Sequence, residues 1–114
     1  MRPFEQAPRR RDIRYPVRLP VIVRLAAAEI AARSENLSLA GILLSSDSLI
    51  PEGSTVDLAV EVGRMSERDV FLTARGTVLR VQPHTSGKFA VAVACDHPFR
   101  ITQANPGTVP KGNS

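Results

Sequence analysis

The sequence contains few of the residues from which disulfides, metal centres and membrane spans are built. Its 114 residues include one cysteine, two histidines and no tryptophan. Cys95 alone cannot form an internal disulfide, and with only His84 and His97 beside it we expect no metal site. Apolar runs are too short to cross a bilayer, and the N-terminus lacks the apolar segment of a signal peptide. The sequence therefore predicts a cytoplasmic protein with no membrane contact.

Arrangements of residues that would support catalysis are also missing. Ser38, Ser45 and Ser46 have no histidine at a suggestive spacing, so a nucleophilic triad is not indicated. No glycine-rich phosphate loop of the nucleotide-binding enzymes occurs. Cys95 ends an apolar alternation and is interpreted as a small core residue rather than a reactive thiol. We therefore expect a binding protein without a cofactor, not an enzyme.

Positive charge is what the sequence does have, and most of it is arginine. Lysine and arginine together number 15 against 11 acidic residues, which gives a net charge of +4, and only two of the 15 are lysines. The arginine fork suits phosphate groups and guanine edges. Five arginines lie within residues 9–18, and they are Arg9, Arg10, Arg11, Arg14 and Arg18. The positive net charge points to an anionic partner. An arginine-rich proteome would give the same ratio of arginine to lysine without a function behind it, so composition alone leaves both interpretations open.

A period of two in apolar residues dominates the chain and predicts six strands. In the first of them, Val17, Leu19, Val21, Val23 and Leu25 share one face. The second could also form a helix because it is rich in alanine. Short strands separated by turn signals favour an antiparallel sheet that closes into a small barrel or packs as a sandwich. The predicted strands are residues 17–25, 28–38, 40–46, 55–62, 70–82 and 88–95.

One domain is expected from this length. We predict a flexible tail at residues 1–8, an ordered domain at 9–100, and a disordered or weakly ordered tail at 101–114, since the last segment has little to bury. A polar loop is expected at residues 63–69. Gly76 interrupts the fifth predicted strand and suggests a bend or bulge there.

A polar turn between the second and third predicted strands contains Asn36, Ser38 and Gly41 in the pattern N-x-S-x-x-G. In one interpretation it is only a tight turn, in which the two side chains bond local backbone and Gly41 supplies a permissive dihedral angle. In the other, the amide and hydroxyl groups meet the edge of a base, and Gly41 allows a close approach.

Two motifs in this order resemble those of the PilZ domain family. Arg10 and Arg14 form R-x-x-x-R directly before the first strand, and the N-x-S-x-x-G turn follows about two dozen residues later. The resemblance covers residues 8–100. It implies an all-β, six-stranded antiparallel barrel with flexible tails, which binds the bacterial second messenger cyclic di-GMP through these two elements.

The resemblance also implies roles for individual residues. Arg10 and Arg14 would contact phosphates and guanines, Asn36 and Ser38 would fix a base edge, and Gly41 would keep the turn tight. Arg9 would add to the arginine clamp. The implied function is a ligand-driven signalling receptor or adaptor that acts on a downstream protein partner. The ligand-binding residues predicted in this way are Arg9, Arg10, Arg14, Asn36, Ser38 and Gly41.

Two other functions remain open at this point. A small basic barrel can bind RNA or single-stranded DNA, but such surfaces stack bases on exposed aromatic rings, and here aromatic residues are only 4% of the chain. This shortage argues against a nucleic-acid partner. The second alternative is an adaptor barrel that docks on protein machinery without binding a nucleotide.

Overall fold

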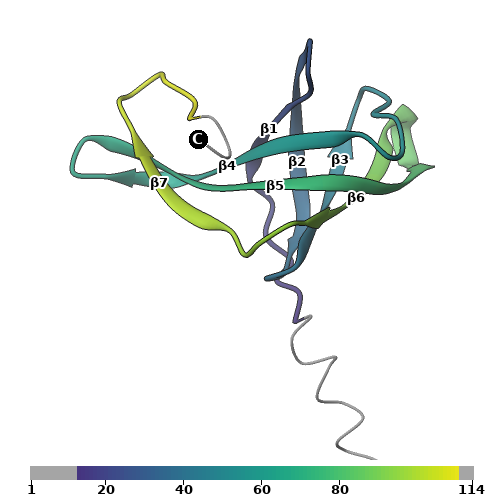
Figure 1. The fold of residues 1–114 in the computed structure, drawn as a ribbon, viewed down its shortest axis with the longest axis horizontal. Coiled ribbons are helices and arrows are strands. Elements are labelled where there is room, and N and C mark those ends of the chain that lie inside the picture. Colours follow the sequence, from purple (N-terminus) through teal and green to yellow (C-terminus); the bar gives the residue numbers. More distant parts are fainter. Residues whose placement is uncertain (1–12, 111–114) are drawn as a thin grey trace, which may run out of the picture.

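In the computed structural model, residues 13–110 are described, and they form strands joined by short connections (Figure 1). Within this range no α-helix forms, and a single turn of 3-10 helix at Thr85–Gly87 joins the fifth strand to the sixth. Seven strands are present in the described part of the chain. They are β1 (Pro20–Arg24), β2 (Glu29–Leu37), β3 (Gly41–Ser46), β4 (Thr55–Met65), β5 (Arg68–Pro83), β6 (Phe89–Cys95) and β7 (Arg100–Ala104).

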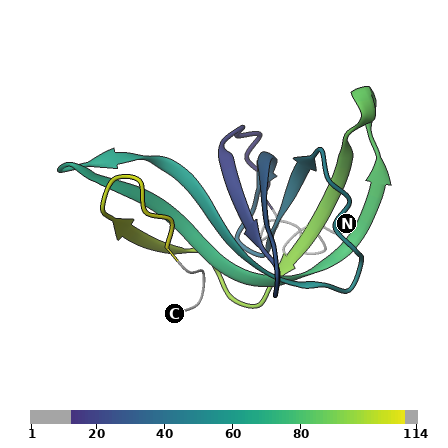
Figure 2. The ribbon, with the colours of Figure 1, turned by 90° about the horizontal axis from the view of Figure 1, so that it is seen from above.

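Six of these strands close into an antiparallel barrel. Their order is β4-β1-β2-β3-β6-β5, and the pairing of β5 with β4 completes the ring. β7 pairs only with β5 and lies outside the barrel (Figures 1 and 2). The predicted all-β, six-stranded antiparallel barrel is therefore confirmed, with one strand added. The alanine-rich second segment is a strand and not a helix, because β2 pairs along its length with β1 and β3.

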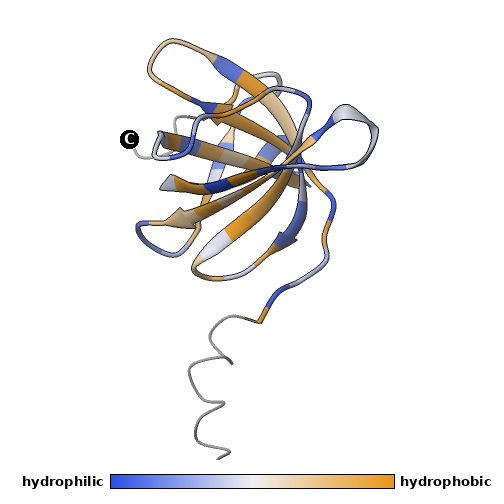
Figure 3. Ribbon diagram, turned by 90° about the vertical axis from the view of Figure 1, so that its right-hand side faces the viewer, coloured by the Kyte–Doolittle hydropathy of each residue, from blue (hydrophilic) through white to orange (hydrophobic). Residues whose placement is uncertain are grey.

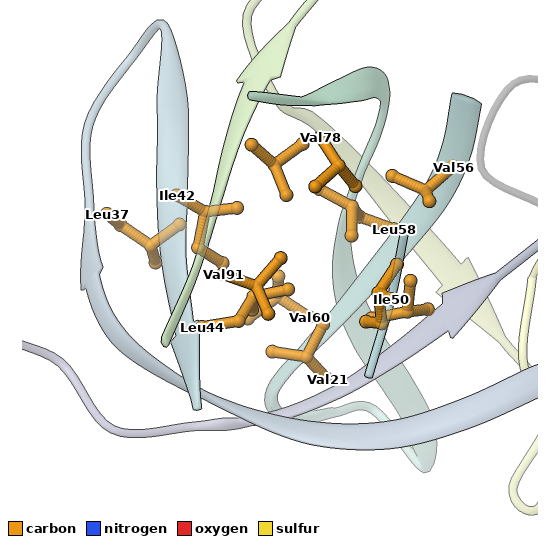
Figure 4. Close-up of a cluster of buried hydrophobic side chains, with 12 residues drawn as sticks. Val21, Leu37, Ile42, Leu44, Ile50, Val56, Leu58, Val60, Val78 and Val91 are labelled. Carbon is orange, nitrogen blue, oxygen red and sulfur yellow. The ribbon is translucent and has the colours of Figure 1, made fainter. Parts of the chain in front are cut away.

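The barrel interior is filled by the alternating apolar residues that the sequence pattern indicates (Figure 4). Figure 3, coloured by hydropathy, shows that hydrophobic residues make up much of the barrel strands. Leu44 and Leu58 are fully buried, as is Ile50 from the connection between β3 and β4. Each such side chain contributes about 1.5–3 kcal/mol relative to an exposed one. The other buried members of the cluster are Val21, Val23, Leu37, Ile42, Val56, Val60, Val78, Val91 and Val93.

The polar loop expected at residues 63–69 is instead a tight hairpin. Ser66 and Glu67 both have positive φ, 52° and 65°, which is the geometry of a two-residue turn between twisted strands. β4 and β5 therefore run past the barrel. Residues 61–65 and 68–73 of these strands, together with β7, form a three-stranded extension that we call the wing (Figure 2).

The C-terminal segment is ordered further than its composition predicts, so the expectation of a weakly ordered tail is wrong for β7. Phe71 and Ala59 lie on the outer face of β5 and β4, and they pack with Ala104 and Val109 in a second, small apolar cluster. Arg24 donates hydrogen bonds to the carbonyls of Val109 and Pro110, both at 3.2 Å. The tail has little to bury by itself, but β4 and β5 provide a partner.

Within residues 13–110 no helix has the length and apolar character that crossing a bilayer requires. Residues 1–12 and 111–114, and with them the predicted N-terminal tail at 1–8, lie outside the described residues.

Candidate functional site

A β-bulge in β2 decides the direction in which Asn36 points. Ser34 pairs with Leu44, but the next paired residue of β2 is Asn36, so Glu35 is an extra residue without a partner. Ser34 is buried inside the barrel, and the bulge restarts the alternation, so Asn36 turns to the outer face and Leu37 returns to the core. If Glu35 were paired in regular alternation, Asn36 would face the apolar interior.

The segment before β1, residues 13–19, runs alongside the end of β2, and we call it the arm. Tyr15 forms a β-bridge with Leu37, in which each backbone N–H donates to the other residue's carbonyl, at 2.7 and 2.9 Å. This bridge places Arg14 beside Asn36. Arg14 Nη1 donates to Asn36 Oδ1 at 3.1 Å on the exposed surface. The structure thus brings together two predicted site residues that are 22 positions apart.

The contact between Arg14 and Asn36 sets what each group can offer to a ligand. The Asn36 carbonyl oxygen accepts from the guanidinium with one of its two lone pairs, and the amide nitrogen keeps its two N–H donors. A guanidinium carries five N–H donors, and this contact uses one of them. The pair therefore presents several donors to a ligand acceptor that approaches from outside the barrel.

Ser38 bonds its own turn, as the purely structural interpretation of the motif predicts. Its backbone N–H donates to the Gly41 carbonyl at 2.9 Å, and its hydroxyl donates to the same oxygen at 3.3 Å. The turn is further tied to β6, because Cys95 N–H donates to the Ala40 carbonyl at 2.8 Å. Ser38 is buried and lies two residues from Asn36.

Gly41 is required by the closeness of β6 rather than by a permissive dihedral angle. Its φ is not in the positive range, but a Cβ at this position would collide with the carbonyl oxygen of Val93. Gly76 has the same relation to the Ala94 carbonyl on the other side of β6. The expectation of a bend or bulge at Gly76 is therefore replaced by a close approach, and the expected special dihedral angle at Gly41 is wrong.

A row of paired residues runs from Asn36 across the outer face of the barrel. Asn36 pairs with Leu43 of β3, which pairs with Ala92 of β6. Ala92 in turn pairs with Arg80 of β5. The outward residues of β6 are alanines, so the middle of this face has short side chains. We call the surface over Leu43, Ala92 and their neighbours the floor of the site.

Arg80 is a candidate site residue that the sequence analysis missed. A second bulge, at Leu79 of β5, places Arg80 on the outer face, while Val78 and Val81 pair with inward residues of β6. Strict alternation from Val78 would have sent Arg80 into the apolar core, where an unpaired guanidinium is not tolerated. That conflict was the signal in the sequence for a bulge at this point.

The comparisons with known proteins agree with this fold. A family model described as the PilZ domain matches residues 8–105. The chain belongs to the PilZ family. PilZ domains are in general receptors for cyclic di-GMP or signalling adaptors.

Three solved chains match the fold of this PilZ domain. One is the Bacillus subtilis inhibitor of motility MotI (DgrA), which superposes with a TM-score of 0.63 at 20% sequence identity. The match covers 76% of this chain but only 42% of MotI, so the chain spans less than half of that protein. At this identity the likeness concerns the fold. No protein of curated function matches the chain in sequence.

Next to the floor, the outer face of this PilZ domain is hollowed into a charged pocket of about 460 Å³. Arg33 lines it and pairs with Ser45, which pairs with Ala90, so the pocket continues the floor by one row. Two exposed ion pairs border it: Arg18 with Glu35 at 3.0 Å, and Lys88 with Asp47 at 2.6 Å. Such pairs contribute little stability, about 0–1 kcal/mol each, and remain available to exchange partners.

Residues that could have supported chemistry are not arranged for it in the described range. Burial raises the pKa of the Cys95 thiol to about 11, with a smaller contribution from the neighbouring Asp96, so the reactive thiolate is suppressed. Cys95 packs against the core cluster, as predicted. Among residues 13–110, no group of three or more His, Cys, Asp or Glu side chains is placed to hold a metal ion.

Arg9 and Arg10, the first predicted members of the arginine clamp, lie outside the described residues. Of the six predicted site residues, Arg14, Asn36, Ser38 and Gly41 gather where the arm meets β2 and the following turn. Arg33 and Arg80 add positive charge to the same outer face.

Proposed function

We propose that this PilZ domain binds cyclic di-GMP on the outer face of β2, β3 and β6 and acts as a ligand-driven receptor or adaptor. The observation that carries the proposal is the contact between Arg14 and Asn36, which joins the two motifs into one surface of donors. Family membership supports the choice of ligand class. Arg9 and Arg10 belong to the proposed site through the R-x-x-x-R motif.

Guanine matches the donors of this surface. Its O6 and N7 atoms are both acceptors on one edge, and an arginine fork or an amide nitrogen can donate to them. Adenine presents the N6 donor where guanine has O6, so it would face donor against donor. Because the free N–H groups of Arg14 and of the Asn36 amide nitrogen outnumber the acceptors beside them, we infer that this surface favours guanine over adenine.

The floor gives a flat dinucleotide room between two positive edges. Asn36 and Arg80 are separated by three strand spacings, about 14 Å at about 4.8 Å each. The alanines of β6 allow a planar base to lie close to the sheet. Arg14 at one edge and Arg80 at the other can each donate to a phosphate, and charge-assisted bonds of this kind are about twice as strong as neutral ones.

Calorimetric titration with cyclic di-GMP and cyclic di-AMP tests the proposal. We expect saturable binding of cyclic di-GMP and at least tenfold weaker binding of cyclic di-AMP, a difference of about 1.4 kcal/mol or more. Equal affinities for the two dinucleotides would contradict the guanine assignment. A short RNA serves as a third ligand, and tight RNA binding would favour the nucleic-acid alternative.

Truncation separates the contribution of the N-terminal arginines from that of the barrel. Removing residues 1–8 takes away no motif residue, so affinity should stay within about twofold. Removing residues 1–14 takes away both arginines of R-x-x-x-R, and we expect binding to be abolished. Equal affinity of the two truncated chains would remove the arginine segment from the proposed site.

The wing favours a second candidate role, contact with a partner protein. Met65 and Ile101 are 58% and 75% exposed there, although both are large and apolar. Exposed apolar residues grouped on one extension are typical of a protein-interaction surface. This role is compatible with ligand binding on the barrel, and it would remain if the titration with nucleotides failed.

A further inference from the structure

Ser34 is a polar residue in a fully buried position of β2, two residues before Asn36. Its hydroxyl accepts a hydrogen bond from the backbone N–H of Leu19 at 2.9 Å and donates one to the carbonyl of Val17. Its own backbone N–H donates to the Leu19 carbonyl at 2.9 Å. One buried side chain is thus bonded to both ends of a three-residue stretch of the arm.

The arm needs these bonds because its backbone pairing with β2 is interrupted. Tyr15 forms its bridge with Leu37, but Pro16 has no N–H, and Val17 N–H donates back to Tyr15. The regular register between β1 and β2 begins only at Pro20. Between Tyr15 and Pro20, the Ser34 hydroxyl satisfies the backbone groups that a continuous strand would have bonded to backbone.

We propose that Ser34 is a positioning residue for ligand binding: its hydroxyl fixes the path of Val17–Leu19 so that Arg14 reaches Asn36. The inference rests on the proposed cyclic di-GMP site. Arg14 lies one residue beyond the Tyr15 bridge, and Val17–Leu19 is the next stretch that is bonded to β2 on the other side of it. If that stretch were released, the bridge alone would hold the arm, and the Arg14 guanidinium would be held less firmly in place. Ser34 itself is buried and does not need to touch the ligand.

Ser46 offers a control with matched chemistry. It is also a fully buried serine, and its hydroxyl bonds one carbonyl and one N–H, both of Ser48, at 2.8 and 3.0 Å. It lies at the far end of β3, away from the arm. Ser34→Ala and Ser46→Ala therefore remove the same kinds of bond from buried sites, but only Ser34→Ala loosens the arm.

The experiment compares cyclic di-GMP affinity and melting temperature for wild type, Ser34→Ala and Ser46→Ala. We expect both variants to melt at a lower temperature, whereas affinity falls about tenfold in Ser34→Ala, the equivalent of one to two hydrogen bonds, and stays within about twofold in Ser46→Ala. Hydrogen exchange of the Leu19 amide should accelerate in Ser34→Ala alone. If Ser34→Ala binds like Ser46→Ala, the inference is wrong.

Two additions separate positioning from general destabilisation and from failure of the proposed function. In a double-mutant cycle, Arg14→Ala should cost less affinity in the Ser34→Ala background than in wild type, because Arg14 is already misplaced there. Strictly additive losses would overturn the positioning role. If Ser34→Ala does not fold, Ser34→Cys keeps the volume with weaker bonds and should show the same pattern in smaller degree. If wild type binds no cyclic di-GMP, the proposed function fails first.

Discussion

The inner and outer faces of β2 and β3 differ completely although they are made of the same two strands. Inside, Leu44 and Ile42 are buried in an apolar cluster that needs no polar partner. Outside, Asn36 accepts a hydrogen bond from Arg14, and Arg33 lines the charged pocket. We therefore expect residues of the inner face to determine stability and residues of the outer face to determine the proposed ligand affinity. Substitutions should affect the two properties separately.

The two faces meet at the Glu35 bulge, where the alternation changes. Ser34 lies before it and bonds the arm from inside the barrel, while Asn36 lies after it and faces the proposed ligand surface. Gly41 also contributes to both faces. Its lack of a side chain lets β6 pack closely, and its carbonyl oxygen accepts the hydrogen bond from the Ser38 hydroxyl in the turn. Only at positions such as these should one substitution change both stability and cyclic di-GMP affinity.

The largest expected effect is on the inner face. Leu44→Ala removes a fully buried side chain and should lower the free energy of unfolding by about 2–5 kcal/mol, a large share of a small domain's 5–15 kcal/mol. Chemical denaturation measures it. The adjacent Leu43→Ala, on the outer face, should cost much less stability but change cyclic di-GMP affinity. If the two leucines destabilise equally, the separation of the faces is wrong.

The next effect concerns affinity alone. Arg14→Ala removes charge-assisted contacts to the ligand, so we expect a loss of about 1.5–3 kcal/mol, or about 10- to 100-fold. The melting temperature without ligand should barely move, since the bond to Asn36 is exposed. Arg64→Ala, at the wing, removes the same charge far from the floor and is the matched control. Equal losses in both variants would show a general charge effect instead of a site.

The inner face could be predicted from the sequence because burial follows a regular alternation. Val21, Val23, Val56, Leu58 and Val60 share the faces that their spacing assigns to them. The site residues were predicted from two motifs whose spacing resembles that of the PilZ family. The same resemblance implied a barrel, whereas the alternation alone was compatible with either a barrel or a sandwich.

The features that could not be predicted are the bulges, which depend on single extra residues in a strand, and β7, which depends on a partner distant in the sequence. A bulge inserts one residue, and the apolar alternation does not indicate which residue is the unpaired one, so Arg80 was missed. In the same way Val62, which lies unpaired between Glu61 and Gly63, is 39% exposed beyond the barrel although it continues the alternation of β4. β7 was missed because its apolar partner, Phe71, lies on an outer face about thirty residues away.

A smaller effect on both properties is expected at the meeting point of the faces. Gly41→Ala places a Cβ against the Val93 carbonyl, so β3 or β6 must shift, and overpacking of this kind lowers stability by about 1–3 kcal/mol. Gly76→Ala meets the Ala94 carbonyl in the same way on the other side of β6. Both variants should unfold at lower denaturant concentration. Only Gly41→Ala should also weaken cyclic di-GMP binding, because it displaces the Ser38 turn; equal affinities would remove the turn from the site.

The smallest expected effect belongs to Ser38, and it tests whether its hydroxyl serves the turn or the ligand. In Ser38→Ala the backbone bond from residue 38 to the Gly41 carbonyl survives, and only the longer 3.3 Å bond from the hydroxyl is lost. We therefore expect the melting temperature to stay nearly unchanged, while cyclic di-GMP affinity falls by about 0.5–1.5 kcal/mol, as for one neutral hydrogen bond. Ser54→Ala, in the turn before β4, is the control for loss of a turn hydroxyl outside the motif, because the Ser54 hydroxyl donates to the Pro51 carbonyl at 2.6 Å. Calorimetry resolves this difference if all three proteins are titrated at one salt concentration. A fall in melting temperature with unchanged affinity would assign Ser38 to the turn alone, and the ligand contact would then rest on Asn36 and the arginines.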